Sequence, residues 1–157
     1  MNKEIARIVV FCLAAATVSL SACTDNAKIK LAISDTCSLD NVVGSTGIPP
    51  LFTVRSGSEV VFQGWVADGI GARVPNSVSV EFVNSKNQVQ FIDSGELKIK
   101  RSDVAAALKS QSVEGAGFAV KSKIQDVVDG EYSILLVGTY DDQKTVCRTN
   151  ISIIIKD

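Results

Sequence analysis

The sequence predicts an all-β fold, an antiparallel β-sandwich with one short helix. Most of the chain after residue 27 alternates apolar and polar residues with period two, which is typical of half-buried strands. Turn-forming residues separate these segments, among them Pro49-Pro50 and the glycines at 69 and 71. Only one segment has a helical pattern. Short strands, frequent turns and one helix indicate two packed β layers, and a closed β-barrel is the alternative.

Eight segments are predicted to be strands. In chain order they are KIKLAI (28–33), SEVVFQGWV (58–66), SVSVEFV (77–83), QVQFI (88–92), ELKIKR (96–101), GFAVKS (117–122), EYSILLVGTY (131–140) and KTVCRTNISIIIK (144–156). In the first segment, Ile29, Leu31 and Ile33 share one face and the lysines share the other. Segment 58–66 is apolar on both faces, as expected of a central strand. The last two segments are predicted to form a hairpin.

The last segment places five residues on one face: Cys147, Thr149, Ile151, Ile153 and Ile155. The isoleucines indicate that this face is turned to the core, and the cysteine is therefore expected on the core side as well.

The exception to the alternation is RSDVAAALKS (101–110). Its central residues are good helix formers, and either Ser102 or Asp103 is predicted to cap the helix. We expect this short helix to cross between the two sheets.

The segment DGEY (129–132) resembles the entry to the penultimate strand of bacterial Ig-like domains, in which a tyrosine follows a turn. The resemblance implies an Ig-like β-sandwich over residues 28–157. Trp65 is similar to the core tryptophan of such domains. Ile134 stands where the immunoglobulin pattern has a cysteine, so the inter-sheet disulfide of that family is not expected at this position.

The amino terminus has the composition of an export signal. Lys3 and Arg7 precede thirteen uncharged residues, 8–20, followed by the small residues Ser21 and Ala22. This run is shorter than the roughly 20 residues of a membrane-spanning helix. Residues 1–22 are therefore predicted to be a signal peptide.

Residues 20–23, LSAC, resemble the lipobox of bacterial lipoproteins. The resemblance implies cleavage before Cys23, acylation of Cys23 and a lipidated tether over residues 23–27. Thr24 stands where inner-membrane lipoproteins of enteric bacteria carry aspartate, which favours the outer membrane of the cell envelope. A plain signal peptide followed by an unrelated cysteine is the alternative.

With Cys12 in the signal peptide and Cys23 acylated, Cys37 and Cys147 remain. Two thiols in an oxidising compartment usually form a disulfide, which is the expectation here. A reactive thiol or a metal site is the alternative, but there is no histidine to support either.

The absence of histidine removes Ser-His-Asp and Cys-His catalysis and the commonest zinc ligand. No phosphate-binding loop is present, and a Ser-Lys pair has no supporting motif. The formal net charge is −1 with no run of like charges, so a nucleic-acid partner is not expected. The chain is predicted not to be an enzyme and to need no cofactor.

Four aspartates, Asp126, Asp129, Asp141 and Asp142, fall in predicted turns, where a calcium site is the alternative to ordinary turn chemistry. The turn interpretation is favoured, and no metal is expected. Together with Tyr140 at the tip of the last hairpin, Asp141 and Asp142 are the predicted contact residues.

The sequence thus predicts a lipid-anchored envelope module that presents loops and edge strands to a protein partner. A module that binds peptidoglycan or a surface polysaccharide is the alternative. Partners are therefore membrane lipid through Cys23 and an unidentified envelope protein or glycan.

Replacing Cys23 by serine should abolish lipid labelling and membrane retention, because serine offers no thiol for acylation. Metabolic labelling with a fatty acid and membrane fractionation measure both. A Cys23→Ser chain that still sediments with membranes would contradict the lipobox interpretation.

Overall fold

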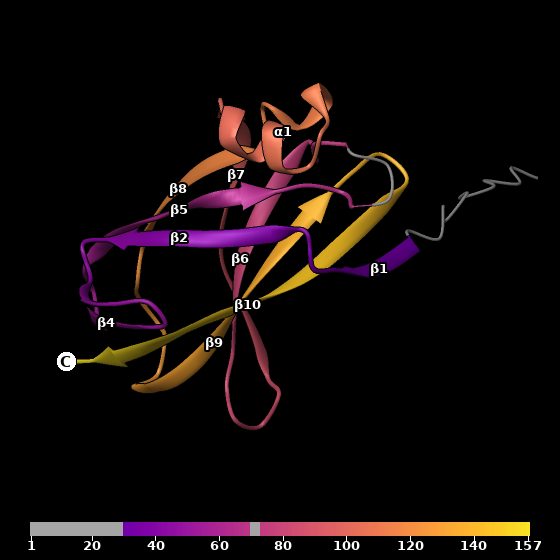
Figure 1. Cartoon of the computed structure of the whole chain (residues 1–157). Coiled ribbons are helices and arrows are strands. Elements are labelled where there is room, and N and C mark those ends of the chain that lie inside the picture. Colours follow the sequence, from indigo (N-terminus) through magenta and orange to yellow (C-terminus); the bar gives the residue numbers. More distant parts are fainter. Residues whose placement is uncertain (1–29, 70–72) are drawn as a thin grey trace, which may run out of the picture.

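The computed structural model describes residues 30–69 and 73–157, and these residues form an all-β fold (Figure 1). The all-β prediction is confirmed. The predicted signal peptide (1–22) and tether (23–27), with Cys23, lie outside the described residues. No helix among the described residues is long and apolar enough to cross a membrane.

The elements in chain order are β1 (Lys30–Ser34), β2 (Cys37–Val43), β3 (Thr46–Ile48), β4 (Leu51–Arg55), β5 (Glu59–Val66), β6 (Ser77–Val83), β7 (Val89–Ile99), α1 (Ser102–Ala107), the 3-10 helix η1 (Gln111–Val113), β8 (Gly117–Lys123), β9 (Gly130–Thr139) and β10 (Gln143–Lys156).

The strands form one curled sheet, a half-barrel. They hydrogen-bond in the order β2-β5-β8-β7-β6-β9-β10-β4-β3, and β1 is added beside β10. Figure 1 shows β2 and β5 running across the direction of β6. The ends of the described sheet are not joined by strand pairing, so the sheet is not a closed barrel.

The curl arises at β7, which pairs with β6 along residues 89–96 and with β8 at Leu97 and Ile99. The sequence predicts two strands here, and this prediction is wrong. Residues 93–95 stay paired with β6, so the strand continues through a sequence that is typical of a turn. A Cβ at Gly95 would lie 3.1 Å from Cγ2 of Val120 on β8, so the glycine allows the close approach at the bend.

Two strand pairs are parallel, contrary to the wholly antiparallel expectation. β1 pairs with residues 143–147 of β10 and β4 pairs with residues 152–156. Both strands therefore lie end to end along the same edge of β10, while β9 pairs with the opposite edge in the predicted hairpin.

The core is built from the inward residues of these strands. The predicted inward face of β10 is confirmed, because Cys147, Thr149, Ile151, Ile153 and Ile155 are all buried. The largest side chains packed against them are Phe62, Phe82, Phe118, Ile134 and Leu136, each at most 1% exposed.

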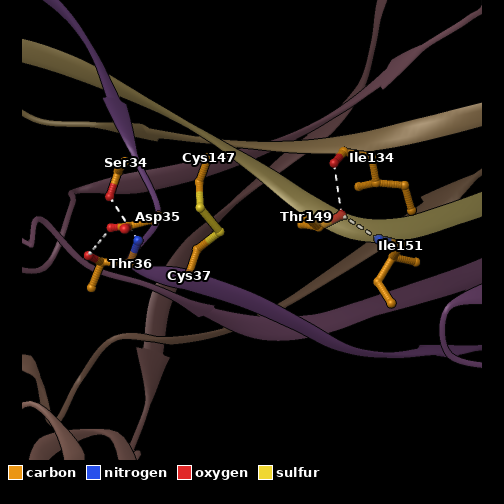
Figure 2. The surroundings of a disulfide bond; sticks show 8 residues. All are labelled: Ser34, Asp35, Thr36, Cys37, Ile134, Cys147, Thr149 and Ile151. Carbon is orange, nitrogen blue, oxygen red and sulfur yellow. Dashed lines mark hydrogen bonds between the residues drawn. A yellow bond between two sulfur atoms is a disulfide. The ribbon is translucent and has the colours of Figure 1, made fainter.

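The predicted disulfide between Cys37 and Cys147 is present and joins β2, at one end of the strand order, to β10 (Figure 2). Cys37 begins β2, the first strand in the sheet order, and Cys147 lies in β10. The bond closes a separation of 110 residues, with the two Cα atoms 6.3 Å apart.

Where β10 slips against β9, between Arg148 and Ser152, Thr149 replaces part of the lost backbone pairing. Its buried hydroxyl donates to the carbonyl oxygen of Ile134 over 2.8 Å and accepts from the backbone N–H of Ile151 over 3.3 Å (Figure 2). The irregularity therefore leaves neither group without a partner.

The predicted helix is present as α1, but its predicted cap is wrong, because the N-cap residue is Arg101 and makes no side-chain capping bond. Asp103 instead accepts hydrogen bonds from Nε and Nη2 of Arg101 over 2.9 and 2.8 Å. Ser102 donates to Glu114 over 3.0 Å.

α1 and η1 cover a small second apolar cluster outside the main core. Its buried members are Ala67, Val104, Ala105, Val113 and Ala116. Trp65 lies half-buried against this cluster, on the face of β5 opposite to Phe62 and Val66. Trp65 therefore does not take the position of the core tryptophan that the sequence resemblance implies.

Replacing Cys37 and Cys147 together by alanine should lower the free energy of unfolding by about 2–5 kcal/mol, because the disulfide restricts a long loop of the unfolded chain. Urea unfolding measures the change. A reductant should lower the midpoint of the parent and leave that of the variant unchanged. Equal midpoints for the oxidised parent and the variant would contradict the assigned role.

Thr149→Val should lower the free energy of unfolding by about 1–3 kcal/mol, because the Ile134 carbonyl and the Ile151 N–H lose their buried partner. Thr145→Val is the matched control. Thr145 lies on the same face of β10 and is 2% exposed, but its hydroxyl has no hydrogen-bond partner in the described structure. Valine should therefore be tolerated there. Equal losses in the two variants, measured by urea unfolding, would contradict this account.

Candidate functional site

The predicted contact residues Tyr140, Asp141 and Asp142 lie in the connection between β9 and β10, as expected. The structure brings Tyr140 and Asp142 together with two residues of the loop after β5, Asp68 and Arg73, and with Gln143. We call these five residues the Asp68 cluster.

Asp68 is the centre of this cluster and is 7% exposed. Its Oδ2 atom accepts hydrogen bonds from Nη2 and Nε of Arg73 over 3.0 and 3.3 Å and from Nε2 of Gln143 over 3.1 Å. Its backbone N–H donates to the carbonyl oxygen of Arg73 over 2.8 Å. The carboxylate thus ties its own loop to the start of β10.

The guanidinium of Arg73 lies over the ring of Tyr140, with Cζ 5.1 Å from the ring centroid. Its Nη1 atom is 3.6 Å from Oδ1 of Asp142. Hydrogen bonding to Asp68 raises the pKa of Arg73, although burial acts in the opposite direction. The arginine is therefore held in one position by three neighbours.

Tyr140 is 7% exposed, so its ring offers no surface for stacking and the predicted surface contact by this ring is wrong. Burial raises the pKa of its phenol to about 12. Asp141 and Asp142 are exposed, and Asp141 accepts a hydrogen bond from Nδ2 of Asn76 over 2.7 Å. Only the two aspartates are therefore accessible to a partner.

Asp68 and Arg73 are absent from the predicted site. The signal available in the sequence is weak: an aspartate and an arginine five positions apart flank a glycine-containing loop. The charges of Asp68 and Arg73 neutralise each other, and the cluster contains no nucleophile paired with a general base. We therefore interpret the Asp68 cluster as a structural clamp that joins the loop after β5 to the β9–β10 hairpin.

A cavity of about 460 Å³ opens beside this clamp, between the start of β10 and β1. Its lining includes Ile33, Asp35, Asp68, Gln143 and Thr145. Thr145 and Tyr140 carry hydroxyls without a hydrogen-bond partner among the described residues.

The aspartates considered for calcium do not come together. Asp126 and Asp129 precede β9, whereas Asp141 and Asp142 follow it, and its ten residues separate the two pairs by roughly 30 Å. Within residues 30–69 and 73–157, no group of three or more acidic or cysteine side chains could hold a metal ion.

The tryptophan and tyrosine rings of the domain, which could stack on a glycan, are largely covered. Tyr132 is 7% exposed and donates its hydroxyl proton to the carbonyl oxygen of Val128 over 2.6 Å. Trp65 is half-buried against the cluster under α1. Tyr132 and Tyr140 therefore present no open ring, and the ring of Trp65 is accessible only in part.

Four of the nine exposed large apolar side chains among the described residues lie on β1, β3 and β4. Leu31 and Ile33 on β1 are 71% and 92% exposed. Ile48 on β3 and Leu51 on β4 are 78% and 42% exposed. The second pair belongs to a hairpin, β3–β4, that turns at Pro49-Pro50 and lies within fourteen uncharged residues, 41–54.

These two apolar pairs lie at different places on the molecule. Ile33 is in register with Val146 and Leu51 with Ser152, six residues further along β10, which corresponds to roughly 20 Å. Figure 1 shows β1 and the turn between β9 and β10 at one end, and β4 with the carboxyl terminus at the other.

No protein-family model matches the chain, and no curated protein matches it. Function is therefore inferred from the residues of the chain itself.

Tyr140→Phe should remove a stability loss at alkaline pH. Because the folded state raises the phenol pKa from its ordinary 10.0 to about 12, the neutral phenol is favoured on folding. The resulting stability is fully present below pH 10 and is lost as the pH rises to 12. Urea unfolding across this range should therefore give a steeper decline for the parent than for Tyr140→Phe. Parallel declines would contradict the burial of the phenol.

Proposed function

We propose that this chain is a lipid-anchored protein of the bacterial cell envelope whose β-domain is a non-enzymatic module that binds a protein partner. The single observation that carries the proposal is the β3–β4 hairpin, which exposes Ile48, Pro49, Pro50 and Leu51 at an edge of the sheet. Contiguous exposed apolar residues mark interaction surfaces, and these residues contribute little to the core.

The lipid anchor is supported by the signal sequence and by the position of Cys23 in the lipobox-like segment. The disulfide agrees with an exported chain, because such bonds persist in oxidising compartments. Thr24 after the cysteine favours the outer membrane.

We also infer that the curled sheet is a variant of the Ig-like sandwich. Taking β2, β5, β6, β7, β8, β9 and β10 as its seven strands, β2-β5-β8-β7 is the order of the first, second, fifth and fourth strands. β6-β9-β10 is the order of the third, sixth and seventh strands. These two orders are the same as those of the two sheets of an immunoglobulin domain, which supports the inference, and the hydrogen bond from Tyr132 to the Val128 carbonyl resembles its tyrosine corner.

A glycan-binding module is the second candidate. It is less well supported, since glycan recognition commonly uses open aromatic rings, whereas the rings of Tyr132 and Tyr140 are buried and Trp65 is half-buried. Sedimentation of the chain with peptidoglycan would favour this candidate over a protein partner.

Ile48→Lys should abolish partner binding, because a charge in the centre of an apolar contact stays unpaired and desolvated. Crosslinking in intact cells, followed by identification of the partner, measures the loss. Val128→Lys is the control, because Val128 is 76% exposed but lies in the loop between β8 and β9. A crosslinked partner retained equally by both variants would contradict the proposed site.

A further inference from the structure

The two outward residues of β1 form an apolar face next to the amino-terminal tether. In the parallel register with β10, Leu31 is opposite Lys144 and Ile33 is opposite Val146, all on the outer face of the sheet. Ala32 and Ser34 are opposite Thr145 and Cys147, whose side chains are buried. Leu31 and Ile33 therefore point away from the core as a consequence of the pairing itself.

No described element covers this face. β1 pairs only with β10 among the described strands, so its other edge is open. Leu31 and Ile33 remain 71% and 92% exposed. A five-residue edge strand with two such side chains needs a partner surface of apolar chemistry.

The length of the tether limits what that surface is. Lys30, the first residue of β1, is seven positions after Cys23. Even a fully extended chain of this length spans only about 25 Å. If Cys23 carries the acyl chains, β1 is the part of the folded domain that is held closest to the lipid.

The charges near β1 do not select an anionic surface. Lys30 and Lys144 are exposed there, but so are Asp35, Asp141 and Asp142. Carboxylates and ammonium groups are thus both present, and the apolar side chains are the feature that distinguishes this face. Lys144 can extend its ammonium group to the headgroups while its methylenes lie beside Leu31.

We propose that Leu31 and Ile33 insert into the surface of the bilayer that holds the acylated Cys23, so that the domain is attached by its lipid and by the β1 face together. This proposal rests on the lipid anchor of the proposed function. It orients the domain, because the β3–β4 hairpin at the other end then points away from the membrane (Figure 1).

The test uses tryptophan as a depth probe in the full acylated chain. Ile33→Trp and, as a second variant, Leu31→Trp place the probe on the β1 face. Ile48→Trp is the matched control, because Ile48 is 78% exposed on the β3–β4 hairpin. Each chain is purified, its acylation is verified by mass spectrometry, and it is reconstituted in vesicles of phosphatidylethanolamine and phosphatidylglycerol with or without brominated acyl chains. The parent, which has Trp65 alone, gives the background emission.

We expect brominated lipid to quench the tryptophan emission of Ile33→Trp and Leu31→Trp, and we expect this emission to shift to shorter wavelength on membrane binding. Ile48→Trp should show neither change. Emission from both β1 variants that is unaffected by bromine overturns the proposal. A shift of the emission wavelength that depends on the protein-to-lipid ratio, without quenching by bromine, also overturns the proposal, because it indicates that a second copy of the chain covers the β1 face. An acylated chain that floats with vesicles but whose tryptophan emission is not quenched overturns the insertion of the β1 face and leaves the lipid anchor in place. A chain whose measured mass includes no acyl group overturns the lipid anchor of the proposed function as well.

Discussion

The fold depends on β10, because this strand holds three other strands and one half of the disulfide. One edge of β10 binds β9, the other edge binds β1 and β4 in succession, and its inward residues form a large part of the core. Among the described residues, no strand pairing joins β2 to β10, so hydrogen bonds between strands do not hold these two strands together. The bond between Cys37 and Cys147 supplies a link between them and holds the first and last parts of the domain together.

Polar residues then fix two parts of the β9–β10 hairpin, the register shift between Arg148 and Ser152 and the turn. Thr149 satisfies the groups left by the slip in the middle of the strands, and the Asp68 cluster fastens the turn between them to the loop after β5. With the hairpin held in this way, the exposed apolar side chains of β1 and the β3–β4 hairpin are the ones that stay open to a partner. The Asp68 cluster therefore has a structural role, whereas β1 and the β3–β4 hairpin are the surfaces available for contacts.

The sequence predicted β1, β5, β6, β8, β9 and β10 because alternation is a local property that each segment carries alone. It missed β2, whose alternation is interrupted by a register shift between Leu39 and Asn41, and the short strands β3 and β4. It also predicted the burial of the Ile151, Ile153 and Ile155 face and the disulfide. It could not predict which face of an edge strand is covered: Leu31 and Ile33 alternate like core residues, yet parallel pairing with β10 turns them outward. Nor could it predict that Arg73, from a distant loop, would cover Tyr140. Both failures concern long-range contacts.

The chemistry of the β3–β4 edge indicates how a partner would be held there. Strand addition needs a row of free backbone groups, but β3 has only three residues, and Pro49-Pro50 follows it without N–H groups to donate. Ser152 donates its backbone N–H to the Pro50 carbonyl, so this carbonyl is directed to β10 and is not an acceptor for an added strand. The backbone is thus poorly suited to extend the sheet, while Ile48 and Leu51 remain exposed. A partner at this edge would therefore be bound through apolar side chains in a groove of its own, with the hairpin as a preformed insert.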